Sequence, residues 1–232
     1  LVAALQRLHA EWRERVRPLV LFNSRSARPG EEEGTAYHFR TREAIAAMAS
    51  QPDRVVLEVR GDLQALDLRQ LEADLAKDDV LFEGNPFIAQ ILQTDDRLSN
   101  IPRRSLFVSP VSAEEIKAFR EFGDPAALVT EVMRRKLLRR TRRQKGEISL
   151  PDLEDIERRA GSAWKELKMA PVFDSVVVNH DGEDSENWDA FPVPIGDARR
   201  TVQAVWNYFD TGTTEDMELW PETLFETRQS PS

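Results

Sequence analysis

Short apolar runs alternate along the chain with longer stretches in which apolar residues recur every three or four positions. The short runs predict buried strands at residues 19–22, 54–60, 79–83, 105–109 and 173–178. The longer stretches predict helices at residues 1–15, 41–48, 66–75, 87–93, 113–122, 126–140, 152–169 and 195–209. Strands that alternate with helices favour an α/β domain with a largely parallel sheet flanked by helices.

The composition is that of a globular protein. Hydrophobic residues make up 41% of the 232 positions and charged residues 31%, and no apolar run approaches the roughly 18 residues of a membrane span. The chain contains no cysteine, which excludes disulfides and thiolate metal sites and fits a reducing compartment. We therefore expect a cytoplasmic protein without a membrane partner.

Charge is distributed unevenly along the chain. The net charge of −9 disfavours a general nucleic-acid binder, yet eight of the twelve residues from Arg134 to Lys145 are basic. A local cationic patch on an acidic protein indicates a discrete anionic ligand, although a solvated helix face has the same pattern. Acidic residues at 181–186 predict a solvated loop, and the mixed sequence from Thr211 on predicts a poorly ordered tail.

The stretch from Arg25 to Phe39 carries the most specific chemistry. It reads Arg-Ser-Ala-Arg-Pro-Gly-Glu-Glu-Glu-Gly-Thr-Ala-Tyr-His-Phe, so two arginines three residues apart precede a Pro-Gly turn, an acidic run and Tyr37. Guanidinium forks and a phenolic hydroxyl suit the oxygens of a terminal phosphate. The alternative is an arginine-rich turn that leads into an edge strand.

This stretch resembles the phosphate-binding segment of guanylate kinases, which reads roughly Thr-Thr-Arg-x-x-Arg-x-Gly-Glu-x-x-Gly-x-x-Tyr-x-Phe. Three further segments resemble that family in the same order. Ser105–Phe119 is similar to its strand and the helix that begins after Pro and Ser. Asp155–Leu167 is similar to its Glu-x-Ile-x-x-Arg-Leu-x-x-Ala-x-x-Glu-Leu helix, and Phe173–Asp181 to its Phe-Asp-x-Val-Val-Val-Asn-Asp-Asp strand.

The resemblance implies a P-loop NTPase fold with a kinase-type, largely parallel sheet. It places the domain at residues 1–209, a small mixed α/β acceptor-binding subdomain at about 22–78, a helical lid at about 113–167 and a tail at 210–232. The helix that begins at Leu1 is similar to the one that directly follows the family's P-loop, and no Walker A sequence occurs in the chain. We therefore expect the P-loop upstream of Leu1, and we expect this chain alone to be inactive.

Several site residues follow from the resemblance. Arg25, Arg28 and Tyr37 would hold the phosphate of the acceptor. Asn179 would lie near the donor adenine or its ribose. Glu83 would organise Mg²⁺ through water, or would instead be a turn or helix-capping carboxylate. The implied cofactors are ATP and Mg²⁺.

Two lid arginines would be catalytic, because phosphoryl transfer needs positive charge around the moving group. Arg159 would reach the transferred phosphoryl group, with Arg158 as the alternative. Arg139 would be the second lid arginine, with Arg135 and Arg143 as alternatives.

The positions that read guanine in the family are altered. A Ser, a Glu and a Tyr-Gly-Ser/Thr of the family correspond here to Leu21, Val55 and residues 64–66, Gln-Ala-Leu. A different set of polar groups would come from Glu58, Gln64 and Asp67. A site whose polar groups hydrogen-bond one base rejects any base that leaves those polar groups unpaired. Because the polar groups differ here from those of the family, the sequence does not identify the acceptor.

Three functions remain open from the sequence. The first is a nucleoside-monophosphate kinase of guanylate-kinase type that uses ATP to phosphorylate GMP or a related phosphorylated acceptor. The second is a non-catalytic guanylate-kinase-like module that binds a phosphorylated peptide or protein partner. The third is a kinase that acts on a sugar phosphate. None of the three predicts a nucleic-acid partner.

Overall fold

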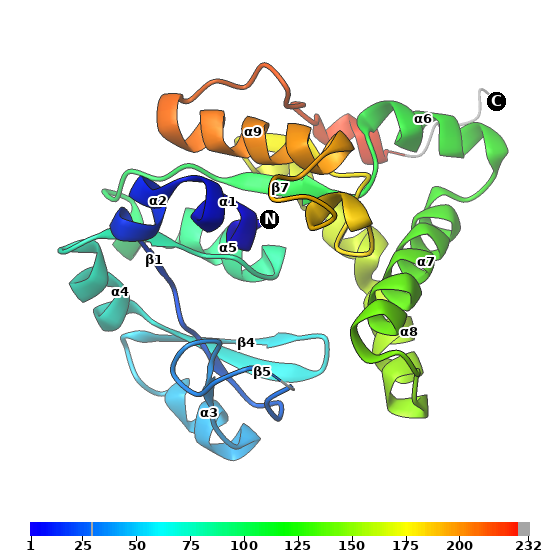
Figure 1. The fold of residues 1–232 in the computed structure, drawn as a ribbon. Helices are drawn as coiled ribbons and strands as arrows, with labels where there is room; N and C mark the ends of the chain where they lie inside the picture. Colours follow the sequence, from blue (N-terminus) through cyan, green and yellow to red (C-terminus); the bar gives the residue numbers. More distant parts are fainter. Residues whose placement is uncertain (29, 227–232) are drawn as a thin grey trace, which may run out of the picture. The chain divides into compact units, whose positions relative to one another are not determined.

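The computed structural model describes residues 1–28 and 30–226 and divides the chain into two compact units (Figure 1). The first unit is His9–Gln93. The second combines the N-terminal helix α1 (Val2–Leu8) with the described chain from Thr94 onward. Among the described residues, no helix combines the length and the apolar character that a membrane crossing requires.

The first unit is built on a four-stranded mixed sheet with the strand order β3-β2-β5-β4. Its strands are β2 (Phe22–Asn23), β3 (His38–Phe39), β4 (Arg54–Val59) and β5 (Asp62–Asp67). Helix α3 (Arg42–Met48) lies against β4 and β5 and buries Ile45 completely. A separate parallel pair joins β1 (Val16–Pro18) to β6 (Asp79–Leu81), and the other helices are α2 (Ala10–Arg15), α4 (Leu68–Leu75) and α5 (Pro86–Thr94).

The hairpin of β4 and β5 depends on a two-residue turn. Arg60 and Gly61 have φ angles of 54° and 89°, so both lie in the left-handed region. Two such residues form the type I′ turn that matches the twist of paired strands, and glycine meets no steric penalty there. The predicted helix start at Leu66 is wrong, because β5 extends through residue 67 and the Asp67 carboxylate caps α4 instead.

The second unit contains the parallel pair β7 (Leu106–Ser109) and β8 (Ser175–Val178). Helix α6 (Ala113–Phe122) follows β7 and begins with a capping box between Ser112 and Glu115. Helices α7 (Pro125–Lys145) and α8 (Leu150–Leu167) form a long hairpin (Figure 1). Helix α9 (Gly196–Thr211) contacts both β8 and α1.

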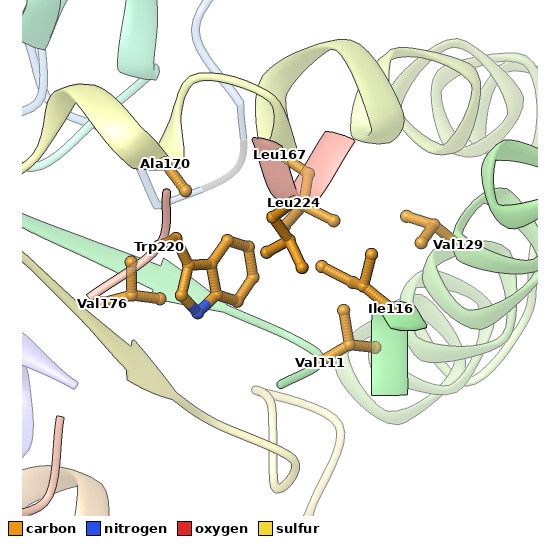
Figure 2. Packing of buried hydrophobic residues seen from close by; sticks show 8 residues of the cluster. All are labelled: Val111, Ile116, Val129, Leu167, Ala170, Val176, Trp220 and Leu224. Carbon is orange, nitrogen blue, oxygen red and sulfur yellow. The ribbon is translucent and has the colours of Figure 1, made fainter. Parts of the chain in front are cut away.

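The C-terminal segment contributes to the core of the second unit. Trp220 and Leu224 pack in one cluster with six other buried residues (Figure 2): Val111, Ile116, Val129, Leu167, Ala170 and Val176. Glu218 pairs with Val176 through two backbone hydrogen bonds of 2.8 Å, and the Trp220 indole donates to the Glu218 carboxylate. The predicted poorly ordered tail is therefore wrong for residues 217–225. Residues 227–232 of that predicted tail lie outside the described part of the chain.

The mixed α/β class is confirmed, but a continuous parallel sheet is not present among the described residues. The parallel pairs β1–β6 and β7–β8 have two strands each, and the largest sheet combines parallel and antiparallel pairs. The P-loop type of sheet and the boundaries of the acceptor-binding subdomain, lid and tail stay predictions.

Candidate functional site

An ion pair between Arg25 and Glu31 organises the loop that joins β2 to β3. The Arg25 guanidinium donates two hydrogen bonds of 2.6 Å to the two carboxylate oxygens of Glu31. Glu31 Oε2 also accepts a hydrogen bond of 2.8 Å from the backbone N–H of Arg28. The side chains of Arg25 and Glu31 are only 15% and 22% exposed. This two-pronged contact fixes the direction of Arg25 and the backbone at Arg28.

Two aromatic rings complete the surroundings of Arg25. Its Cζ lies 5.1 Å from the ring centroid of Tyr37 and 5.7 Å from that of Phe39, within the range of cation–π attraction. Phe39 pairs with Asn23, and Asn23 pairs with Gln64. Because side chains alternate between the faces of a sheet, these three residues share one face.

Arg25 and Glu31 stabilise each other's charged forms. Burial alone would lower the pKa of Arg25, but the hydrogen bond and the negative charge of Glu31 outweigh burial and raise that pKa. The hydrogen bond from Arg25 lowers the pKa of Glu31 against the opposite effect of burial. Both groups are therefore ionised at neutral pH, and the charge of Arg25 is already matched by a carboxylate.

Arg28 and Tyr37 differ from Arg25 in their access to solvent. Arg28 is exposed and Tyr37 is half-buried. The structure therefore separates two arginines to which the resemblance assigns one role: Arg25 holds the loop together, and Arg28 is accessible to an anion. Glu31 was not among the predicted site residues. The sequence does point to Glu31, because the guanylate-kinase segment that this stretch resembles has a glutamate directly after the glycine that follows its second arginine.

Glu58 and Gln64, predicted to read the acceptor base, lie on opposite faces of the sheet. Gln64 pairs with Leu57, so the next residue, Glu58, lies on the other face. Its Oε2 accepts a hydrogen bond of 2.7 Å from Arg42 at the start of α3. Asp67 is the N-cap of α4. The structure does not assemble the three into one base-reading set, and their role in binding stays a prediction.

Glu83 lies in the exposed turn between β6 and α5. The side chain of the nearby Asn85 accepts a hydrogen bond of 2.9 Å from the backbone N–H of Phe87 and so caps α5. Within the described ranges, no group of three or more His, Cys, Asp or Glu side chains is placed to hold a metal ion. A single carboxylate can hold Mg²⁺ only with several waters, so the assignment of Glu83 stays a prediction.

The predicted lid arginines lie on the α7–α8 hairpin. Arg139 is largely exposed on α7, and its Nη1 lies 3.8 Å from the nearest carboxylate oxygen of Asp184. Arg159 lies on α8, with its Nη1 3.8 Å from Asp155. The alternative, Arg158, is 2.5 Å from the same carboxylate. Arg139 therefore keeps the freedom to turn toward an anionic ligand.

Asn179 directly follows β8. Its backbone N–H donates a hydrogen bond of 2.8 Å to the carbonyl of Ser109, which extends the ladder between β7 and β8. Its side-chain Oδ1 is buried and has no hydrogen-bond partner among residues 1–28 and 30–226. Since a buried acceptor without a donor is costly, this position suits a ligand that supplies an N–H group.

The segment from His180 to Asp189 contacts the helices α6, α7 and α9. His180 lies 2.9 Å from Glu115 on α6 and 3.4 Å from Asp197 on α9. Lys136 of α7 donates a hydrogen bond of 2.6 Å to the His180 carbonyl, and burial lowers the pKa of this lysine. Carboxylates farther along the segment bind arginines of α7. The predicted loop is present and its Glu183 and Glu186 are exposed, but it is not simply solvated, because Arg140 and Arg143, about 40 residues earlier in the chain, contact it.

Among solved structures, the chain aligns with guanylate kinase from Anaplasma phagocytophilum. The TM-score is 0.50 over 92% of this chain and 85% of that chain, at 17% sequence identity. The fold is similar to that of a guanylate kinase. No protein-family model and no curated protein sequence matches the chain. At this identity the likeness concerns the fold alone, so it supports the guanylate-kinase-like fold and not the role of any residue.

Proposed function

We propose that this chain is a nucleoside-monophosphate kinase of guanylate-kinase type, which transfers a phosphoryl group from ATP to GMP or a related phosphorylated acceptor. The observation that carries the proposal is the organised loop from Arg25 to Tyr37 in a guanylate-kinase-like fold. Glu31 and two aromatic rings hold Arg25, and Glu31 also fixes the backbone at the exposed Arg28.

In this proposal, Arg28 and Tyr37 bind the acceptor phosphate, because an exposed guanidinium and a phenolic hydroxyl both donate to phosphate oxygens. Arg25 keeps its pair with Glu31 and acts as a positioning residue. Gln64 lies on the same face of the sheet as Phe39 and can contribute to binding the acceptor. Glu58 lies on the opposite face, so the class of acceptor base stays open.

The second unit has residues that fit a polyphosphate nucleotide. The buried, unpartnered Oδ1 of Asn179 fits the amino group of adenine, and Arg139 and Arg159 offer donors for phosphate oxygens. When bound, ATP with Mg²⁺ supplies the phosphoryl group. Arg139 and Arg159 would bind and orient the phosphates and stabilise the charge that develops during transfer. Glu83, a residue of the first unit, would hold Mg²⁺ through water.

The proposed reaction also depends on a Gly-rich Lys-Ser/Thr loop. Phosphoryl transfer depends on donors that cradle the phosphates, and the chain has no such loop sequence. The residues of this chain are therefore proposed to bind and position the nucleotides.

The test replaces Arg28 with alanine and measures the binding of nucleoside monophosphates by calorimetry. Loss of one charge-assisted contact, worth about 1.5–3 kcal/mol, weakens binding by about ten- to a hundredfold. Arg13→Ala is the matched control, since Arg13 is an exposed arginine of α2 in the same unit, and it leaves the affinity unchanged. Equal affinity of wild type and Arg28→Ala for every monophosphate that binds would contradict the proposal, as would no binding at all.

A non-catalytic phosphate-binding module is the second candidate, and the separation of Glu58 from Gln64 favours it. A coupled assay of the complete protein with GMP, dGMP, AMP, UMP, CMP and a hexose phosphate distinguishes a nucleotide kinase, a sugar-phosphate kinase and a binding module. Turnover of one nucleotide supports the nucleotide kinase, and turnover of the hexose phosphate alone supports a sugar-phosphate kinase. Binding of a phosphoserine peptide through Arg28 without any turnover supports the module.

A further inference from the structure

The segment 181–189, which we call the acidic arm, carries five carboxylates and no basic side chain. Hydrogen bonds within the segment and to α9 hold it in a compact form between β8 and α9. Asp181 accepts hydrogen bonds from the side chain of Asn187 at 2.7 Å and from the backbone of Ala198 at 2.9 Å. The Trp188 indole donates to the carbonyls of Asp181 and Gly182, both at 2.8 Å. The acidic arm is therefore held in place at both of its ends.

Helix α7 turns one basic face toward this part of the chain. Residues three or four apart lie on the same face of a helix, and this spacing connects Lys136, Arg139, Arg140 and Arg143. Lys136 binds the carbonyl of His180, directly before the acidic arm. The three arginines contact the acidic arm itself.

Each of these arginines has its own oxygen partners on the acidic arm. Arg140 Nη1 lies 2.6 Å from Glu183 Oε2. Arg143 donates a hydrogen bond of 2.7 Å to the Ser185 carbonyl, and its other terminal nitrogen binds the Asp189 carboxylate. Arg139, the residue proposed to bind phosphate, has Asp184 as its nearest carboxylate partner, at 3.8 Å. The acidic arm thus presents oxygens to the donors that a polyphosphate would use.

Carboxylate and phosphate oxygens compete for the same guanidinium donors. The acidic arm competes at high effective concentration because it belongs to the same chain. Its pairs are individually weak, since Glu183 and Asp189 are 63% and 59% exposed. A ligand with several closely spaced negative charges can therefore replace them.

On the basis of the function proposed above, we infer that the acidic arm is an intramolecular competitor that occupies the α7 arginines until a polyphosphate displaces it. The arm thereby sets the affinity of this face for anions and excludes ligands with a single charge.

The test uses inorganic tripolyphosphate and a variant that combines Glu183→Gln with Asp189→Asn. Asp181 and Asp184 stay unchanged so that the fold of the segment is kept. The matched control combines Glu215→Gln with Asp216→Asn, two exposed acids of the same unit that change the net charge equally. Both are made in the Arg28→Ala background, so that the proposed acceptor site does not contribute.

We expect the acidic-arm variant to bind tripolyphosphate about fivefold more tightly than its parent, which corresponds to about 1 kcal/mol. The control changes the affinity by less than about twofold. Tripolyphosphate also speeds amide exchange across residues 181–189 in the parent. Equal tightening in both variants would mean that bulk charge is responsible and would overturn the inference, and so would no binding to any variant. Monophosphate binding that depends on Arg28 is measured separately, so the proposed function can survive that result.

Discussion

Replacement of Glu31 by glutamine tests the physical basis of the candidate phosphate site. The substitution keeps the size of the side chain but removes its charge and one of its two acceptor oxygens. Arg25 loses one of its two hydrogen bonds of 2.6 Å, and the backbone N–H of Arg28 loses a charged acceptor. Arg25 then lies largely buried beside Tyr37 and Phe39 without the carboxylate that its guanidinium contacts at both nitrogens.

The expected cost lies between two limits. Exposed ion pairs contribute about 0–1 kcal/mol, and removal of one partner from a buried pair costs about 3–5 kcal/mol. The side chains of Arg25 and Glu31 are 15% and 22% exposed, so we expect a loss of about 2 kcal/mol. The segment from Arg25 to Phe39 would then open about thirtyfold more often.

Native-state amide exchange of peptides from this segment measures that loss, and calorimetry measures monophosphate affinity in parallel. Glu32→Gln is the control, because Glu32 is the exposed neighbouring carboxylate. Arg28→Ala weakens binding without increasing exchange, whereas Glu31→Gln changes both. If Glu31→Gln changes the opening free energy by no more than Glu32→Gln does, Glu31 does not organise the loop, and the reasoning is refuted.

Two further predictions concern stability. Trp220→Ala removes a side chain that is 5% exposed and lowers the free energy of urea unfolding by about 3–5 kcal/mol, whereas Leu219→Ala, at 78% exposure, changes it by less than about 0.5 kcal/mol. Equal effects would mean that the C-terminal segment does not pack in the core. The lowered pKa of Glu31 makes its pair with Arg25 stabilising above the ordinary value of 4.5, and this contribution is lost as the pH falls through the folded-state pKa. Urea unfolding between pH 7 and pH 3 should therefore show a smaller acid-induced loss of stability in Glu31→Gln, and identical pH profiles would exclude the linkage.

Features that depend on neighbouring residues were predictable from the sequence. Thr41 is the N-cap of α3, as its position before an apolar helical pattern predicts, and its side chain accepts a hydrogen bond from the backbone of Ala44. The turn after β4 contains Gly61, a residue type that favours turns, and the backbone there has a positive φ. Helix α8 was predicted from its amphipathic pattern to within two residues at each end.

The base-reading set and the C-terminal segment depended on distant contacts. Whether Glu58 and Gln64 share a face depends on strand register, which only the hairpin pairing sets. Trp220 lies in a stretch without helical or strand periodicity, and its burial depends on residues from β8, α6 and α8. Neither feature has a signal within a few neighbouring positions.

The sequence by itself determined the mixed α/β class, most of the helices and a segment from Arg25 to Phe39 that resembles a phosphate site. Caps, turns and periodicity depend on interactions within a few residues, so the order of amino acids is enough to predict them. Only the tertiary structure decided which charges are already paired. It joins Arg25 to Glu31 and the arginines of α7 to the acidic arm, because an ion pair forms where the fold brings opposite charges together.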